Sequence, residues 1–281
     1  MAYKFIPGKM YMMPTHFGPG LGPRQGPGGR KFDCQKSPRS ITYSVRCLTS
    51  EKQLEELLPA GFQLYGEPVV TVSVSFLTKI DWLAGRGYNT LAVNFPAEFE
   101  GRVDRARGPF LAVLWENLAD PILTGREQLG FSKIYCEIPP PVSLNGETRC
   151  KADWLGFNFM DMNLADMKNS VPREIESSFN QDDDSVQSGI LHYKYVPRTE
   201  EWGDPDGEYA VLTPSATPNR KVIRQSHGQG SVHFHQASWE ELPTQYHIVN
   251  ALHELEQLDF CGADIIETVG SKDLSDQRIL R

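Results

Sequence analysis

Short runs of alternating or β-branched apolar residues recur along the chain. Segment 40–47 alternates, 69–76 is almost continuously β-branched, and 89–95 and 109–115 repeat the pattern. Segment 77–83 continues or bends the second run. Alternation with a period of two, bounded by turn residues, is typical of β-strands. The first half therefore predicts four or five strands, separated by turns at Gly85-Arg86-Gly87 and at the charged stretch 98–108.

The second half repeats this type of pattern without repeating the sequence. It predicts a strand within 148–159 and further strands at 191–196, 209–213, 221–225 and 230–237. The acidic stretch 174–188 and the Pro/Gly-rich stretch 197–207 are expected to be solvated loops. Many short strands joined by turns favour a curled, largely antiparallel sheet and an α+β, mainly β fold class.

Helical patterns are few. Segment 51–58 follows the capping candidates Thr49 and Ser50, and segment 120–129 is a second short helix that ends at Gly130. Segment 246–258 carries its apolar residues at helical spacing, which predicts plain packing of one face against the sheet.

Prolines and glycines dominate residues 1–30, which cannot form regular helix or sheet. The aromatic residues Tyr3, Phe5, Tyr11 and Phe17 suggest an arm that docks, on a neighbouring subunit for example, and a disordered leader is the alternative. We therefore expect an arm (1–30) followed by one large domain (31–281).

Composition narrows the class of protein. Hydrophobic content of 40% and charged content of 23% are ordinary for a globular protein, and the net charge of −8 argues against a nucleic-acid partner. No stretch approaches the roughly 20 apolar residues of a membrane span, and the N-terminus lacks the apolar run of a signal peptide. A cytoplasmic protein with no membrane partner is expected. Its five widely spaced cysteines are interpreted as reduced thiols.

One lysine, Lys133, lies among apolar and small residues in the stretch Gly125-Arg126-Glu127-Gln128-Leu129-Gly130-Phe131-Ser132-Lys133-Ile134-Tyr135. Such neighbours would desolvate an ammonium group, and desolvation favours the neutral amine, which is the nucleophilic form. The alternative is a surface lysine whose stem packs on apolar neighbours and whose amine reaches water.

The run Gly125-Arg126-Glu127 followed by Phe131-Ser132-Lys133 resembles the signature of the acetoacetate decarboxylase family, Gly-Arg-Glu and then aromatic-Pro-Lys-Lys. The order of Leu57-Leu58-Pro59, Gly61-Phe62 and Glu67-Pro68 is also similar. The resemblance implies a cone- or barrel-like sheet of antiparallel strands with a few flanking helices, and a homo-oligomer. It also implies that Lys133 forms a Schiff base with a keto acid or ketone, without a cofactor. Activation of a lysine by its surroundings is the general principle behind such chemistry, and acetoacetate decarboxylase is its standard example.

Two departures from the signature bear on the substrate. The second lysine of the family pair is Ile134 here, and the proline before the first lysine is Ser132. The positions of two pocket glutamates of the family fall near Ser73 and Thr90, so a less charged pocket is expected.

Further site residues follow from the resemblance and from their chemistry. Arg126 would bind a substrate carboxylate, or pair with Glu127 or Glu116 in a structural network. Arg39 is offset by about one residue from the family's carboxylate-binding arginine. Tyr88 and Tyr246 are candidate proton donors near the pocket. Glu127, Leu129 and Phe131, neighbours of Arg126 in the same segment, are expected to line the substrate site.

Metal sites are not favoured. His233 and His235 would share one face of a strand and need a third ligand such as His227 or His16, but no motif supplies it. The triplet Asp182-Asp183-Asp184 lacks the spaced ligands of a calcium loop.

The sequence thus predicts a Schiff-base lyase that acts on a β-keto or α-keto acid, with decarboxylation as the first expectation. One alternative is an aldolase-dehydratase or hydratase of the same superfamily in a secondary pathway. A second is a non-catalytic protein that binds a small ligand or serves in assembly.

Overall fold

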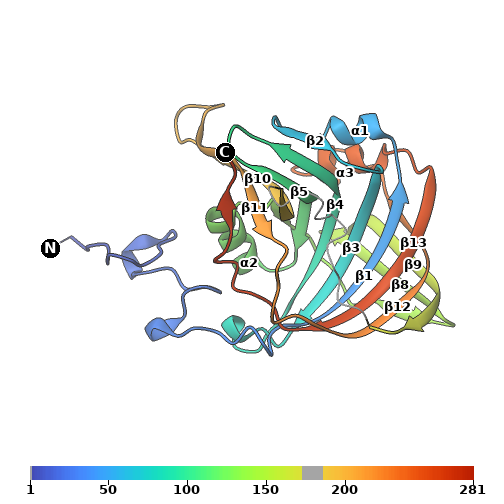
Figure 1. Cartoon of the computed structure of the whole chain (residues 1–281), viewed down its shortest axis with the longest axis horizontal. Coiled ribbons are helices and arrows are strands. Elements are labelled where there is room, and N and C mark those ends of the chain that lie inside the picture. The colour runs from blue at the N-terminus through green and yellow to red at the C-terminus, as the bar shows by residue number, and fades with distance from the viewer. Residues whose placement is uncertain (1, 173–185) are drawn as a thin grey trace.

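A computed structural model of the chain describes residues 2–172 and 186–281. Its main feature is one strongly curled sheet of 14 strands in the order β14-β11-β10-β5-β4-β3-β1-β13-β12-β9-β8-β7, with β2 added beside β4 and β6 beside β5 (Figure 1). The strands are β1 (Arg39–Leu48), β2 (Phe62–Leu64), β3 (Val69–Thr78), β4 (Tyr88–Glu100), β5 (Arg105–Glu116), β6 (Lys133–Tyr135), β7 (Val142–Leu144), β8 (Glu147–Trp154), β9 (Phe157–Ser170), β10 (Gln187–Pro197), β11 (Pro205–Pro214), β12 (Lys221–Phe234), β13 (Asp259–Val269) and β14 (Arg278–Ile279).

Helices are short and lie at the margins of the sheet. They are α1 (Glu51–Glu55), α2 (Ala119–Thr124) and α3 (Tyr246–His253). A π-helical turn, Gly125–Leu129, continues α2, and Gly130 ends it in the left-handed conformation at φ 75°. The predicted break at Gly130 is therefore confirmed, since glycine adopts that conformation without steric cost.

The predicted mainly β class and largely antiparallel sheet are confirmed. Most strand pairs are antiparallel, but β5 pairs in parallel with β10 and with β6. Both parallel partners use the edge of β5 that β4 leaves open, β10 around Ala106–Phe110 and β6 at Leu114–Glu116. The sheet is thus largely antiparallel, as expected, and its parallel pairs lie at β5, beside the strand that carries Lys133.

Several strands are longer than their sequence patterns indicate. The charged stretch 98–108 belongs mostly to β4 and β5, and 221–225 and 230–237 fall largely within the single strand β12. A register shift between His227 and Gln229 breaks the alternation of β12 without breaking the strand. Segment 148–159 is the hairpin of β8 and β9, the sequence pattern missed β13, and the last helix ends at His253 instead of residue 258. Most of the predicted loop 174–188 and the triplet 182–184 lie outside the described residues.

Two apolar clusters pack against the sheet. The larger one contains Phe95, Trp115 and Phe159 and fills the inside of the curl. The smaller one, Leu111, Leu129 and Phe131, lies under the π-helical turn. Because side chains alternate along a strand, Glu116 faces away from the large cluster that holds Trp115.

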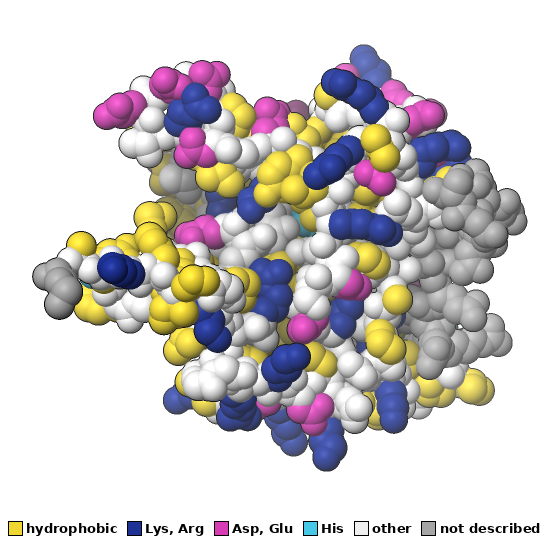
Figure 2. Space-filling model, turned by 60° about the vertical axis from the view of Figure 1, so that its left-hand side comes forward, with side chains coloured by type: hydrophobic (Ala, Val, Ile, Leu, Met, Phe, Trp, Pro, Cys, Tyr) yellow, Lys and Arg dark blue, Asp and Glu magenta, His cyan; other side chains and the backbone are white. Residues whose placement is uncertain are grey.

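The N-terminal segment extends away from the sheet (Figure 1). It has internal structure: the Gln25 amide donates to the carbonyl oxygens of Met10 and Gly20, and the rings of Phe5 and Tyr11 are in edge-to-face contact. Apolar side chains gather on its surface (Figure 2), and Phe17 is 84% exposed. Its docking partner stays a prediction. No helix in residues 2–172 or 186–281 has the length and apolar character of a transmembrane span.

Candidate functional site

Lys133, the first residue of β6, is buried beside a carboxylate. Its Nζ atom lies 2.9 Å from Oε1 of Glu116 and donates a hydrogen bond of 3.1 Å to the carbonyl oxygen of Pro121. The side chains of Lys133 and Glu116 are 8% and 1% exposed. The surface-lysine alternative is therefore excluded by the geometry.

Glu116 ends β5 and lies opposite Thr90 of β4. Thr90 stands near the position of a pocket glutamate of the family. In this chain Glu116, beside it on β5, supplies a carboxylate that faces Lys133. Oε2 of Glu116 is buried and has no hydrogen-bond partner in the described chain. Burial raises the pKa of Glu116 above its ordinary value, and the charge and hydrogen bond of Lys133 partly offset that rise.

The Gly-Arg pair of the signature has a direct physical role in placing Lys133. Gly125 lies against the lysine side chain: a Cβ at position 125 would be 2.4 Å from Lys133 Cδ and 2.7 Å from Nζ. Arg126 donates a hydrogen bond of 2.7 Å from Nη1 to the carbonyl oxygen of Lys133. The glycine leaves room for the amine, and the arginine fixes the backbone that carries it.

The amine lines a cavity of about 570 Å³. Pro121 and Thr124 of α2 and Leu129 of the π-helical turn lie around Lys133 in its wall. The other walls come from the connection between β3 and β4, from β10 and β11, from the segment after β13, and from the start of the chain. Residues of these walls include Phe32, Pro38, Leu77, Ile80, Trp82, Tyr88, Pro109, Ile190, Thr213, Lys272 and Leu274.

Tyr88, at the start of β4, shares this cavity with Lys133. Burial, and secondarily the nearby charge of Glu116, raise the pKa of Tyr88 above its ordinary value. The phenol therefore stays protonated at neutral pH and is a hydrogen-bond donor.

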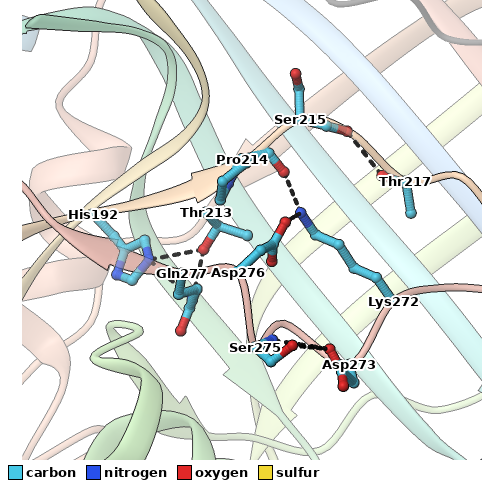
Figure 3. Close-up of polar contacts among 10 residues, drawn as sticks. All are labelled: His192, Thr213, Pro214, Ser215, Thr217, Lys272, Asp273, Ser275, Asp276 and Gln277. Carbon is cyan, nitrogen blue, oxygen red and sulfur yellow. Dashed lines mark hydrogen bonds and ion pairs between the residues drawn. The ribbon is translucent and has the colours of Figure 1, made fainter.

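Polar side chains form a hydrogen-bonded chain that includes Thr213, a residue of the cavity wall (Figure 3). The Gln277 amide donates to Thr213 Oγ1 at 2.6 Å, and His192 lies 3.1 Å from Thr213 and 3.0 Å from the carbonyl oxygen of Gly130. A carbonyl only accepts, so Nδ1 of His192 carries the proton and Nε2 accepts from Thr213. Burial lowers the pKa of His192 to about 4, and the imidazole stacks on Phe131 with ring centroids 4.3 Å apart.

A second amine on the cavity wall is already engaged. Lys272 contacts Asp276 at 2.7 Å and the carbonyl oxygen of Pro214, as Figure 3 shows. Asp273 nearby accepts hydrogen bonds from the backbone and hydroxyl of Ser275.

The structure brings together three of the residues singled out in the sequence, Lys133, Tyr88 and Leu129, as parts of one cavity wall. The ring of Phe131 lies behind them, with its centroid 5.6 Å from Lys133 Nζ. Four other candidates are not part of that wall: Arg39, Arg126, Glu127 and Tyr246. Arg126 and Glu127 are exposed at the π-helical turn, Arg39 is exposed at the start of β1, and Tyr246 begins α3.

Sequence reasoning missed Glu116 as the partner of the lysine. The available signal was a carboxylate placed directly after the apolar run 109–115, where a buried strand would carry it inward. His192 was missed because it belongs to a strand pattern in which a histidine is unremarkable. The histidines considered for a metal are engaged elsewhere: His235 pairs with Asp161, and His227 contacts Asp264. The described residues contain no cluster of three or more ligands that would hold a metal ion.

Comparison with known proteins identifies the family. The family model "Acetoacetate decarboxylase (ADC)" matches residues 12–261. No protein of curated function matches the chain.

Among solved structures, the acetoacetate decarboxylase from Legionella pneumophila is similar, with a TM-score of 0.63, 16% identity, and coverage of 91% of this chain and 92% of that one. The enduracididine biosynthesis enzyme MppR, complexed with the condensation product of pyruvate and imidazole 4-carboxaldehyde, gives a TM-score of 0.59 at 15% identity, covering 92% and 97%. An acetoacetate decarboxylase-like enzyme from Sphingomonas wittichii RW1 gives 0.61 at 14%, covering 87% and 92%. At these identities the structures establish the fold, while the family match rests on most of the sequence: the chain belongs to the acetoacetate decarboxylase family.

Proposed function

We propose that this protein is a Schiff-base lyase that decarboxylates a β-keto acid through an iminium ion on Lys133. The observation that carries the proposal is the pair of Lys133 and Glu116, 2.9 Å apart and buried, at the wall of a cavity large enough for a substrate. A carboxylate within hydrogen-bond distance of the amine can take its proton, and an adjacent general base is one way in which enzymes activate a nucleophile.

The reaction proceeds in four steps. Neutral Lys133 adds to the ketone carbon, and loss of water gives the iminium ion. The bond between the α-carbon and the carboxylate then breaks, carbon dioxide leaves, and the bonding electron pair moves to the iminium nitrogen to give an enamine. A proton adds to the carbon, and water hydrolyses the resulting iminium to release the ketone and Lys133.

Glu116 is the proposed proton acceptor for Lys133. Its raised pKa lies closer to that of an amine than an exposed glutamate's would, which reduces the cost of moving a proton from nitrogen to oxygen. The unpartnered Oε2 atom is a second acceptor at the same position. Glu116 would hold the proton during addition and return it when water leaves.

Aldol condensation followed by dehydration is a second candidate. MppR, whose fold is similar, has been captured with a condensation product of pyruvate and an aldehyde. In this chain Tyr88 lies in the same cavity as Lys133 and keeps its proton. An enamine on Lys133 would attack an aldehyde, and Tyr88 would donate a proton to the oxygen that leaves as water.

Borohydride reduction tests the proposal. The protein is mixed with acetoacetate, with pyruvate, or with pyruvate plus an aldehyde, and then reduced and digested for peptide mass spectrometry. We expect an adduct on Lys133 that is absent in Lys133→Ala, together with release of carbon dioxide from the β-keto acid.

Two other outcomes redirect the assignment. A Lys133 adduct with pyruvate that grows by the mass of the aldehyde less one water, without carbon dioxide release from any β-keto acid, supports condensation and dehydration. No adduct from any carbonyl compound contradicts the enzyme proposal and supports a non-catalytic, ligand-binding protein.

A further inference from the structure

The cavity beside Lys133 is far larger than a short keto acid. Its volume of about 570 Å³ equals the liquid volume of roughly twenty water molecules at about 30 Å³ each. It falls in the range of about 300 to 1,000 Å³ that is typical of sites for drug-sized ligands. Acetoacetate, with its four carbon atoms, would leave most of this space filled with water.

The space beyond the amine has apolar walls. Leu77 near the end of β3, with Ile80 and Trp82 of the β3–β4 connection, forms one side, and Ile190 of β10 lies in another wall. The start of the chain adds the ring of Phe32. Such walls stabilise a ligand by removing its apolar surface from water, in proportion to the area buried.

The segment that supplies Phe32 is held to the body at Asp81 and at Ser271. Asp81 pairs with Arg30 at 2.7 Å, accepts a hydrogen bond from the backbone of Asp33, and its own backbone donates to Ser37. Ser271 donates hydrogen bonds to the carbonyl oxygens of Cys34 and Ser37. Residues 31–38, which we call the arm root, are therefore fixed as a wall of the cavity.

The charged side chains of the wall are largely occupied by protein partners. Lys133 is paired with Glu116, Lys272 with Asp276, and Asp81 with Arg30. Arg220 also has an interaction partner within the chain. A ligand body in this space is therefore recognised mainly by apolar contact.

We propose that the substrate of this protein carries a bulky apolar group, an aromatic ring or an alkyl chain, attached to the ketone that reacts with Lys133. The carbonyl end reaches the amine near Pro121 and Thr124. The apolar group lies between the arm root, the β3–β4 connection and Ile190. This inference rests on the proposed Schiff-base chemistry for the reacting end and on the cavity walls for the remainder.

A series of stable methyl ketones tests it. The full-length protein is titrated with 2-butanone, 2-hexanone, 2-octanone and 4-phenyl-2-butanone, reduced with borohydride, and the occupancy of Lys133 is measured by mass spectrometry. We expect the half-saturating concentration to fall about fourfold for each added methylene that the cavity buries, since each is worth about 0.8 kcal/mol. Half-saturation at the same concentration across the series, or tighter trapping of 2-butanone, overturns the inference.

Two matched substitutions locate the apolar group. Ile190→Trp fills the cavity from its β10 wall, and we expect the preference for 2-octanone over 2-butanone to shrink at least tenfold. Ile223→Trp introduces the same change on β12, at a residue that is 53% exposed and outside the cavity wall, and should leave the preference unchanged. An equal effect of both substitutions contradicts the placement.

Failure of the chemistry and failure of the substrate class give different results. Binding of 4-phenyl-2-butanone to Lys133→Ala is measured by calorimetry, because this variant retains the apolar walls. Binding there without any adduct on the wild-type protein sinks the Schiff-base proposal and supports the apolar site. An adduct with 2-butanone and no gain from longer ketones supports the Schiff-base proposal and contradicts the apolar site.

Discussion

Gly125 lies so close to Lys133 that any side chain at position 125 would collide with the lysine. A Cβ at this position would lie 2.4 Å from Cδ and 2.7 Å from Nζ of the lysine, although the backbone of Gly125, at φ −67° and ψ −40°, is helical and suits every residue. The glycine is therefore required for the room that it leaves and not for its conformational freedom.

Gly125→Ala should displace the amine without unfolding the protein. A misplacement of about 1 Å costs roughly a hundredfold in rate, so we expect that loss in the rate of borohydride trapping. Gly207→Ala is the control, because its Cβ would meet Tyr209 at an ordinary 3.6 Å. Equal trapping rates in the two variants would show that the contact is unimportant.

Glu116→Gln keeps the shape of the side chain and removes its ability to accept a proton. Adduct formation on Lys133 should slow by about a hundredfold or more. In the wild-type protein the trapping rate should fall as pH drops through the raised pKa of Glu116, and this acid limb should be absent in the variant. A wild-type profile without that limb argues against Glu116 as the acceptor.

The same pair has a stability signature. Removal of one partner leaves a buried unpaired charge, so Glu116→Gln should lower the free energy of unfolding by about 3 to 5 kcal/mol. The double variant Glu116→Gln/Lys133→Met should recover part of that loss in denaturant unfolding. A double variant less stable than Glu116→Gln would contradict the ion-pair argument.

His192 should make the fold sensitive to mild acid. Its pKa is about 4 in the folded protein, against 6.5 for an ordinary histidine, so the unfolded chain binds the proton first as pH falls. Stability is therefore full above pH 6.5 and is lost between 6.5 and about 4, by about 3 kcal/mol in total. In His192→Gln, the free energy of unfolding should lose this component of its pH dependence. Parallel curves for the two proteins would refute the assignment.

Tyr88→Phe separates the two candidate reactions. Because the phenol is proposed to donate a proton only during condensation and dehydration, Lys133 should still form its adduct in the variant. Formation of a condensed product from pyruvate and an aldehyde should fall about a hundredfold. A loss of the simple adduct instead would place Tyr88 in the addition step.

Asp81→Ala should loosen the start of the arm root, near Phe32, while Ser271 still holds its end. Limited proteolysis is expected to cut faster at Arg30 and Lys31, and the preference for long ketones should weaken as one cavity wall becomes mobile. Asp206→Ala removes a comparable exposed carboxylate that pairs with Arg198, and should change neither result.

The sequence was sufficient for features that depend on local pattern. Alternation identified most strands, the left-handed Gly130 identified the turn before β6, and the signature identified Lys133. Glu116 was not identified as its partner because that contact depends on the parallel pairing of β5 with β6, and alternation along a strand does not specify its neighbour.

Some residues that were expected at the site do not line the cavity, and the reason is again that the chemistry of a side chain does not specify its partner. Arg126 was expected to bind a substrate carboxylate or to pair with Glu127 or Glu116, whereas its Nη1 atom donates to the carbonyl oxygen of Lys133. Conversely, Phe32 and Asp81 reach the cavity through contacts between distant segments, which no local pattern reports.

Because β6 is short, few contacts determine on which side of the sheet the amine of Lys133 lies. This strand has three residues, and its register rests on a few ties, including the hydrogen bonds from Arg126 to Lys133 and from Leu114 to Ser132. A slip by one residue reverses which side of the sheet each side chain faces. Such a slip would turn Lys133 away from Glu116, so the orientation of the amine depends on contacts that the rest of the sheet does not need.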